Sequence, residues 1–223
     1  MNRLHLAARL IPVLLMIAMI TGCSSVKFEP TVSSLYIDKD GTVSGADIES
    51  FDNSSFTEER YKAEDLTAFV EEEVKAYNQE KAGVSEAYAP EEKDKKEDST
   101  PLPVSIGSIT VEDAKAKLIL HYANCDDYLA FTKADDTVTG LLFATARSAQ
   151  EADLFPADLI DTKGGTLDAS KYLDSDKAFL VSVIGTTQVV VNGKIIGTSE
   201  SVELVDEHTV NVDSKEAVWV LFK

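Results

Sequence analysis

Two cysteines carry the most reactive side chains of this sequence, and their surroundings differ. Cys23 follows the apolar and small residues Ile20, Thr21 and Gly22 near the start of the 223-residue chain. Small neighbours leave the backbone open to a modifying enzyme, and the thiol is the best nucleophile nearby. Cys125 precedes two aspartates, whose charges disfavour a thiolate. We therefore expect covalent modification at Cys23 and an unreactive, at least partly buried thiol at Cys125.

The first residues of the chain have the composition of an export signal. Arg3 and Arg9 precede an apolar run over residues 10–20, and no acidic residue occurs before Glu29. A helix needs roughly 20 apolar residues to cross a bilayer, so this run of about eleven is too short to span it. The pattern predicts a cleaved signal peptide over residues 1–22.

The residues from Ile20 to Cys23 resemble the lipobox of bacterial lipoproteins, although that family more often has leucine where this chain has Ile20. The resemblance implies that a peptidase recognises Ile20, Thr21 and Gly22. It also implies that Cys23 starts the mature chain and carries diacylglycerol with acyl chains such as palmitate. Two acyl chains hold a protein stably on a bilayer. The expected location is the extracytoplasmic face of the cell membrane.

Alternatives to lipidation stay open from the sequence alone. Cys23 would then be incidental after an ordinary secretory leader, or residues 1–22 would remain as an uncleaved anchor. The number of membranes of the host, one or two, also stays open. For a host with two membranes, the resemblance to bacterial lipoproteins implies that Ser24, directly after the lipidated cysteine, favours sorting of the protein to the outer membrane. Taken whole, the chain resembles the acidic lipoproteins of Gram-positive bacteria to which no function has been assigned.

Acidic residues dominate the exported part. The whole chain has 21 lysines and arginines against 39 aspartates and glutamates, a net charge of −18. Residues 1–22 contain two arginines and no acid, so 19 basic residues and a net charge of −20 remain without them. Such a charge argues against nucleic acid as a partner. It also repels anionic headgroups, so the body is expected to stand off the membrane and to touch it only through the covalent lipid.

A short acidic segment imitates part of a calcium-binding loop. Asp38, Asp40, Gly41 and Asp47 have the spacing of positions three, five, six and twelve of an EF-hand or dockerin-like loop. Tyr36 occupies position one, where a carboxylate is expected, and no second copy of the loop occurs. The three aspartates are candidate metal ligands, but an acidic turn without an ion is the simpler interpretation. We predict neither a metal nor a cofactor.

Known catalytic motifs are absent from the sequence, and we predict no catalytic residue. The chain has no G-x-S-x-G elbow, H-E-x-x-H helix, glycine-rich phosphate loop or paired C-x-x-C. His121 and Cys125 would act as base and nucleophile only if a strand-to-helix junction brought them together. Trp219 is expected to be a core residue, and His208 is expected to be a surface residue.

Apolar periodicity predicts a hairpin and a helix in the N-terminal part. Residues 31–37 and 42–51 resemble strands on either side of Asp40-Gly41, which predicts a hairpin. From about residue 63 to 78, apolar residues recur at intervals of three and four, which predicts an amphipathic helix with its stripe in the core. The stripe consists of Leu66, Phe69, Val70, Val74 and Tyr77. Residues 79–106, charged and interrupted by prolines, predict a disordered linker or loop.

The C-terminal half is predicted to be β-rich with short helices. We expect a strand over residues 109–122, a short helix capped by Asn124, a strand over 141–145 and helical turns over 148–153. Asn192-Gly193 predicts a further hairpin. Valine-rich strands are expected at residues 178–184, 187–191, 194–197, 202–205, 209–212 and 217–222. The fold class is α+β, with residues 31–78 and 107–223 forming one domain behind a lipidated tether, residues 23–30.

Three functions from different classes fit these features. The anchor and the lack of motifs predict a non-catalytic lipoprotein that binds a small ligand or another envelope protein. A solute-binding lipoprotein of a transporter would instead show repeated βαβ units in two lobes. A carboxylate-dependent envelope hydrolase would show a pocket containing an acid of raised pKa. The sequence identifies neither the ligand nor the oligomeric state.

Overall fold

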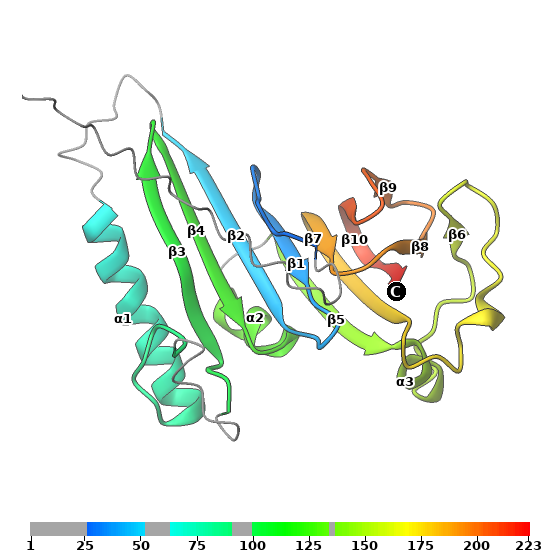
Figure 1. Cartoon of the computed structure of the whole chain (residues 1–223), viewed down its shortest axis with the longest axis horizontal. Coiled ribbons are helices and arrows are strands. Elements are labelled where there is room, and N and C mark those ends of the chain that lie inside the picture. The colour runs from blue at the N-terminus through cyan, green and yellow to red at the C-terminus, as the bar shows by residue number, and fades with distance from the viewer. Residues whose placement is uncertain (1–25, 52–62, 91–99, 134–136) are drawn as a thin grey trace, which may run out of the picture.

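A computed structural model describes residues 26–51, 63–90, 100–133 and 137–223. Its strands form a single sheet with the path β3-β4-β2-β1-β7-β10-β8-β6, while β5 pairs with β7 and β9 pairs with β10. Figure 1 shows α1 running along β3 at one end of the sheet, with α2 and α3 packed further along it. The predicted α+β class with a β-rich C-terminal half is confirmed.

The elements have the following bounds. The strands are β1 (Ser34–Ile37), β2 (Val43–Ser50), β3 (Val104–Glu112), β4 (Lys115–Tyr122), β5 (Val138–Thr145), β6 (Ile160–Asp161), β7 (Phe179–Val191), β8 (Ile195–Thr198), β9 (Glu203–Leu204) and β10 (Thr209–Phe222). The helices are α1 (Ala63–Ala82), α2 (Cys125–Phe131), α3 (Ala146–Glu151) and the 3₁₀ turn η2 (Ala169–Lys171).

The predicted N-terminal hairpin is confirmed. β1 pairs antiparallel with β2, from Ser34 opposite Ala46 to Ile37 opposite Val43. Gly41 turns the chain with a φ of 86°, which costs glycine no steric strain. β1 also pairs in parallel with β7, so strands from the two ends of the chain share one sheet.

Two local predictions in the sheet are wrong. Asn192-Gly193 does not form a β-hairpin, because β10 lies between β7 and β8 and pairs with both. Residues 109–122 do not form one strand, because β3 and β4 fold back on each other around Asp113 and Ala114. Both turn residues have positive φ, 50° and 58°, as in a type I′ turn, which an Asp-Ala pair does not signal.

Helix α1 is held to β3 by a buried asparagine. The Asn78 side chain is fully buried; its Nδ2 donates to the Val104 and Glu86 carbonyls, each at 2.7 Å, and its Oδ1 accepts from Val104 N at 3.0 Å. The segment predicted as a disordered linker, residues 79–106, therefore has regular secondary structure at both of its ends, since α1 continues to Ala82 and β3 begins at Val104. Residues 91–99, the charged centre of that segment, lie outside the described residues.

The sheet separates two apolar cores. Successive residues of β10 point to opposite faces, so Phe222 joins the larger core with α1 and α2, whereas Leu221 joins the smaller core with α3. The α3 core contains Ala146 and Leu180, and Trp219 packs against it. Trp219 is therefore a packing residue, as predicted.

Candidate functional site

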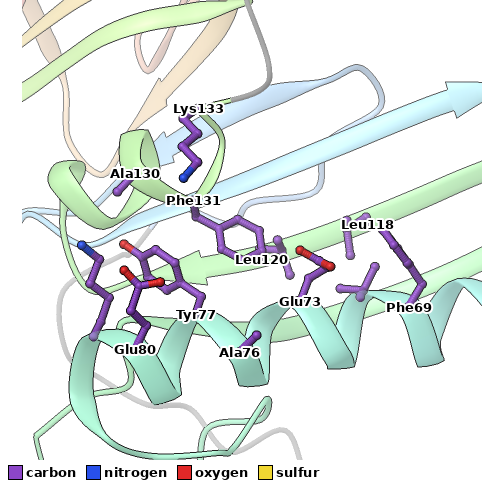
Figure 2. Close-up of a pocket in the computed structure, with 12 residues that line it drawn as sticks. Phe69, Glu73, Ala76, Tyr77, Glu80, Leu118, Leu120, Ala130, Phe131 and Lys133 are labelled. Atoms are coloured by element: carbon purple, nitrogen blue, oxygen red, sulfur yellow. The ribbon is translucent and has the colours of Figure 1, made fainter.

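An apolar cavity lies between α1, β4 and the end of α2 (Figure 2). Leu118 and Leu120 of β4 form its floor, Phe69 and Tyr77 of α1 form one wall, and Phe131 of α2 forms the other. Its volume is about 540 Å³, within the range of about 300–1,000 Å³ that is typical of small-molecule sites.

A second cavity adjoins the first and extends over β2 and β1. The two share Phe69, Leu118, Leu120 and Phe131, and the second has a volume of about 680 Å³. We call the two together the apolar groove. Further lining residues of the second cavity are Leu35, Gly45, Ala46, Tyr122 and Tyr128.

Strand register places the floor residues on one face of the sheet. Leu120 lies opposite Gly45 of β2, and Gly45 lies opposite Leu35 of β1. Directly paired residues share a face, so both leucines point into the groove. Gly45 leaves space beside Tyr122 and Tyr128, whose rings meet edge to face at 5.1 Å.

Aromatic rings join the two walls. The rings of Tyr77 and Phe131 form a T-shaped pair with centroids 5.4 Å apart. The ring centroid of Tyr122 lies 6.0 Å from that of Phe131. The Tyr77 hydroxyl donates to Asp127 Oδ1 at 3.1 Å. Burial, and then the charge of Asp127, raises the pKa of Tyr77 to about 12, so the hydroxyl keeps its proton at neutral pH. These contacts fix α1 to α2 across the groove.

Phe69 departs most from its predicted place. Val70 and Val74 of the same stripe are buried as predicted, but 62% of Phe69 is exposed. An exposed aromatic residue beside other open apolar side chains commonly marks a site of interaction in a soluble protein. Periodicity identifies the stripe, but it does not indicate which part of the stripe stays uncovered.

Charged side chains also line the groove: both signs occur in the first cavity, whereas the second has acidic side chains alone. They are Glu73, Glu80, Lys81 and Lys133 in the first cavity, and Asp47 and Glu49 in the second. Lys81 Nζ lies 5.7 Å from the centre of the Tyr77 ring. A largely apolar lining with a few charged groups suits an amphipathic ligand.

His121 and Cys125 are not brought together. Cys125 is buried in the larger core, whereas His121, between buried neighbours along β4, points to the other face of the sheet. Burial, and then the charge of Asp126, raises the pKa of Cys125 to about 12. Few thiolates form at neutral pH, so a cysteine nucleophile has no support here.

His121 instead pairs with Ser44 of the neighbouring strand. The Ser44 Oγ lies 2.8 Å from His121 Nδ1, and Nε2 lies over Gly107. Desolvation lowers the pKa of His121, which favours the neutral ring. A serine hydrolase orients its histidine through a second hydrogen bond on the far ring nitrogen. Here glycine backbone occupies that position, so the pair is a cross-strand contact.

The two alternative functions gain no support in the described ranges. β1 with β7 is the single parallel pair among the described strands, so repeated βαβ units are not seen there. The described carboxyl groups with a perturbed pKa all have lowered values, because each accepts hydrogen bonds, and a hydrolase acid needs a raised one. These groups are Glu29, Glu71, Asp161, Asp168 and Glu207.

The acidic segment after β1 does not assemble into a metal site. Asp40 Oδ1 accepts from Thr42 N and Oγ1 at 2.9 and 2.7 Å, and Asp38 Oδ1 accepts from Asn192 Nδ2 at 2.8 Å. Asp47 lies within β2. Of the residues that the structure describes, no three or more His, Cys, Asp or Glu side chains form a group that could hold a metal. Asp38 and Asp40 therefore stabilise turns through these hydrogen bonds.

The predicted lipidation site, Cys23, and the predicted recognition residues Ile20, Thr21 and Gly22 lie outside the described residues. Lipidation stays a prediction. In the part of the chain that the structure covers, no helix combines the length and the apolar character that crossing a bilayer requires.

Comparisons with known proteins add little to this geometry. No protein-family model matches the sequence, and no curated protein matches it. Among solved structures, the chain is similar to the folded domain of LppM from Mycobacterium tuberculosis, with a TM-score of 0.34 and 9% identity over 91% of this chain and 95% of that one. A similarity at this level carries no argument about fold or function.

Proposed function

We propose that this chain is a membrane-anchored extracytoplasmic lipoprotein whose apolar groove binds the hydrophobic part of an amphipathic molecule without catalysing a reaction. The groove carries the proposal, because it combines an aliphatic floor with aromatic walls and leaves Phe69 62% exposed. Open, concave and mostly apolar surfaces are the usual binding sites of small molecules. The perturbed pKa values near the groove, those of Tyr77 and Cys125, keep both groups protonated.

The dimensions of the groove favour a narrow hydrocarbon such as one acyl chain. The first cavity follows α1 from Phe69 to Lys81, which at about 1.5 Å per residue corresponds to about 18 Å. The net charge of −20 that remains without residues 1–22 disfavours a polyanionic ligand. An uncharged or zwitterionic amphiphile is the class of ligand that fits best.

Cys23 supports the anchored part of the proposal, through the lipobox resemblance of the residues before it. Replacing Cys23 by alanine and fractionating cells tests this part. We expect the wild-type protein in the membrane fraction with an acyl mass on its N-terminal cysteine, and the variant outside that fraction. Equal membrane retention of both proteins, without acyl mass on the wild type, would contradict the anchor.

Binding to the groove is testable with the uncharged probe N-phenyl-1-naphthylamine, whose fluorescence rises in apolar surroundings. Ala76 lines the groove and is exposed on α1, so Ala76→Trp fills the site without disturbing the core. Gln79 is exposed on the same helix and does not line the groove. Gln79→Trp is therefore a matched control that adds the same side chain to the same helix outside the groove, at a somewhat smaller helix-propensity cost.

We expect saturable probe binding to the wild type, at least about tenfold weaker binding to Ala76→Trp, and wild-type binding to Gln79→Trp. Circular dichroism would establish that both variants are folded. Equal probe affinity for the wild type and Ala76→Trp would show that the probe binds elsewhere, and the proposed site would then be wrong.

A further inference from the structure

Residues 26–30, which precede β1, lie against the sheet, and we call them the N-terminal strap. Val26 N donates to Asn192 Oδ1 at 3.1 Å. The ring of Phe28 stacks on that of Tyr36, with centroids 5.4 Å apart. The segment predicted from sequence as a free tether is therefore fixed from Val26 onward.

The strap lies on the face of the sheet opposite to the groove. Lys117 Nζ donates to the carbonyl oxygen of Pro30 at 2.9 Å. Lys117 is adjacent to Leu118 in β4, and Tyr36 is adjacent to Leu35 in β1; both leucines line the groove. Adjacent residues of a strand point to opposite faces of the sheet. The strap therefore leaves the groove open.

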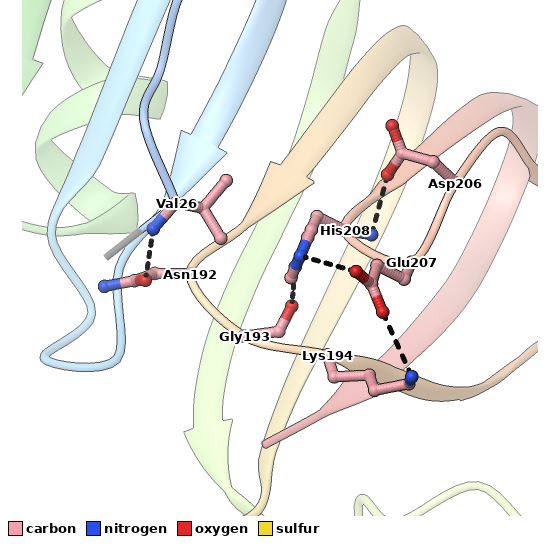
Figure 3. A network of polar contacts seen from close by, with 7 residues as sticks. All are labelled: Val26, Asn192, Gly193, Lys194, Asp206, Glu207 and His208. Carbon is pink, nitrogen blue, oxygen red and sulfur yellow. Dashed lines mark hydrogen bonds and ion pairs between the residues drawn. The ribbon is translucent and has the colours of Figure 1, made fainter. Parts of the chain in front are cut away.

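The strap begins where three turns meet (Figure 3). Asn192, which accepts from Val26, also donates through Nδ2 to Asp38 at 2.8 Å. His208 Nδ1 donates to the Gly193 carbonyl at 2.6 Å. These bonds join the turns into one surface, which we call the anchor end. It consists of residues 38–41, 192–194 and 206–208.

We propose that the anchor end faces the phospholipid headgroups directly, with the strap as a short, fixed mount. This inference rests on the lipid anchor proposed above. Cys23 precedes Val26 by three residues, and an extended chain spans at most about 3.6 Å per residue, so the two α-carbons lie within about 11 Å. Because Val26 is bonded to Asn192, the domain remains at this distance unless the strap detaches. The charge of the body does not move it away, contrary to the sequence-based expectation.

The charges of the anchor end indicate that the covalent lipid alone holds it at the bilayer. Lys194 pairs with Glu207 at 3.0 Å, while Lys39 is outnumbered by the acidic residues Asp38, Asp40 and Asp206. The anchor end is therefore not a basic patch, and we expect little salt dependence of membrane association. The opposite end of the sheet carries Asp113; the eight residues of β2 separate the two ends by about 23 Å.

Fluorescence quenching by nitroxide-labelled headgroups tests this orientation. Acylated mature protein, starting at Cys23, with a fluorophore on Lys39→Cys or Asp113→Cys is placed in vesicles of phosphatidylglycerol and phosphatidylethanolamine. Both positions are exposed, and Cys125 is buried. We expect at least about threefold stronger quenching at position 39 than at position 113, given their separation along the strands. A flexible ten-residue Gly-Ser insertion before Val26 should reduce the quenching at position 39 to the level at position 113.

The outcomes separate this inference from the proposed anchor. Equal quenching at both positions of an acylated, vesicle-bound protein would overturn the orientation and leave the anchor standing. Unchanged quenching at position 39 after the insertion would also overturn it, because the strap would then not set the distance. Absence of acyl mass would overturn the anchor and this inference together.

Discussion

The two apolar regions on opposite faces of the sheet differ in how completely they are covered. Beneath α3, the side chains of Ala146, Leu180 and Leu221 have no exposed surface. Along the groove, Leu118 is only partly buried and 62% of Phe69 is exposed. Helix α3 packs directly on β5 and β7. On the groove side, α1 packs mainly on β3 and α2 packs mainly on β5, and β4 lies between the two helices. A fold that closes one apolar region fully and leaves another open indicates a binding surface at the open one.

The largest expected effect tests whether Cys125, at the start of α2, is closed off from the groove. In a Cys23→Ser variant, we expect iodoacetamide to modify Cys125 about 1,000-fold more slowly in the folded protein than in the unfolded chain at pH 8. The pKa of about 12 lies well above the ordinary 9.0, so the folded state contains less of the reactive thiolate and the rate should rise with pH. Mass spectrometry follows the reaction, and similar rates in both states would place the thiol in the groove.

The second effect compares one leucine from each region. Leu221→Ala removes a fully buried side chain, and we expect the free energy of unfolding to fall by about 4 kcal/mol. Leu118→Ala removes a partly buried one, and we expect a loss of about 1 kcal/mol. Urea titration measures both values. Equal losses would mean that the groove is as well packed as the α3 core, and the contrast between the regions would disappear.

The third effect concerns the clamp that holds α1 at the edge of the groove. Asn78→Leu leaves the Val104 amide and the Glu86 carbonyl without their partner, so we expect a loss of about 3 kcal/mol of stability. Gln79→Leu, at the exposed neighbouring position, should change stability by less than about 0.5 kcal/mol. If the two variants unfold at the same urea concentration, the asparagine does not hold the helix.

Local signals in the sequence predict much of the fold. Asn124 caps α2 as expected, since its Oδ1 accepts from Asp127 N at 2.8 Å, and Asp40-Gly41 turns between β1 and β2. The prediction fails where a distant strand decides the pairing. Asn192-Gly193 favours a hairpin locally, but β10, whose first residue is Thr209, takes the position between β7 and β8. Turn chemistry contains no information about such an insertion.

The groove is only partly predictable for a similar reason. Its residues Phe69 and Tyr77 belong to the stripe that periodicity identifies on α1, and Phe131 belongs to the predicted short helix. Whether a stripe is covered depends on the spacing between α1 and α2 across β4. That spacing follows from contacts between distant residues, such as the Tyr77–Phe131 pair, which a single sequence does not reveal.

The smallest expected effect on stability separates binding from packing at adjacent positions of α1. Phe69 is 62% exposed and Val70 is 6% exposed. We expect Phe69→Ala to change the free energy of unfolding by less than about 0.5 kcal/mol, because little of its contact surface lies in the core. Val70→Ala should lose about 2 kcal/mol through the methyl groups it removes from the core. Probe binding should show the reverse order, with several-fold weaker binding to Phe69→Ala and a smaller loss for Val70→Ala, because Val70 also lines the groove but is only 6% exposed. A large stability loss in Phe69→Ala would make Phe69 a core residue, as its periodicity predicts, and the open region would then be an imperfectly packed core.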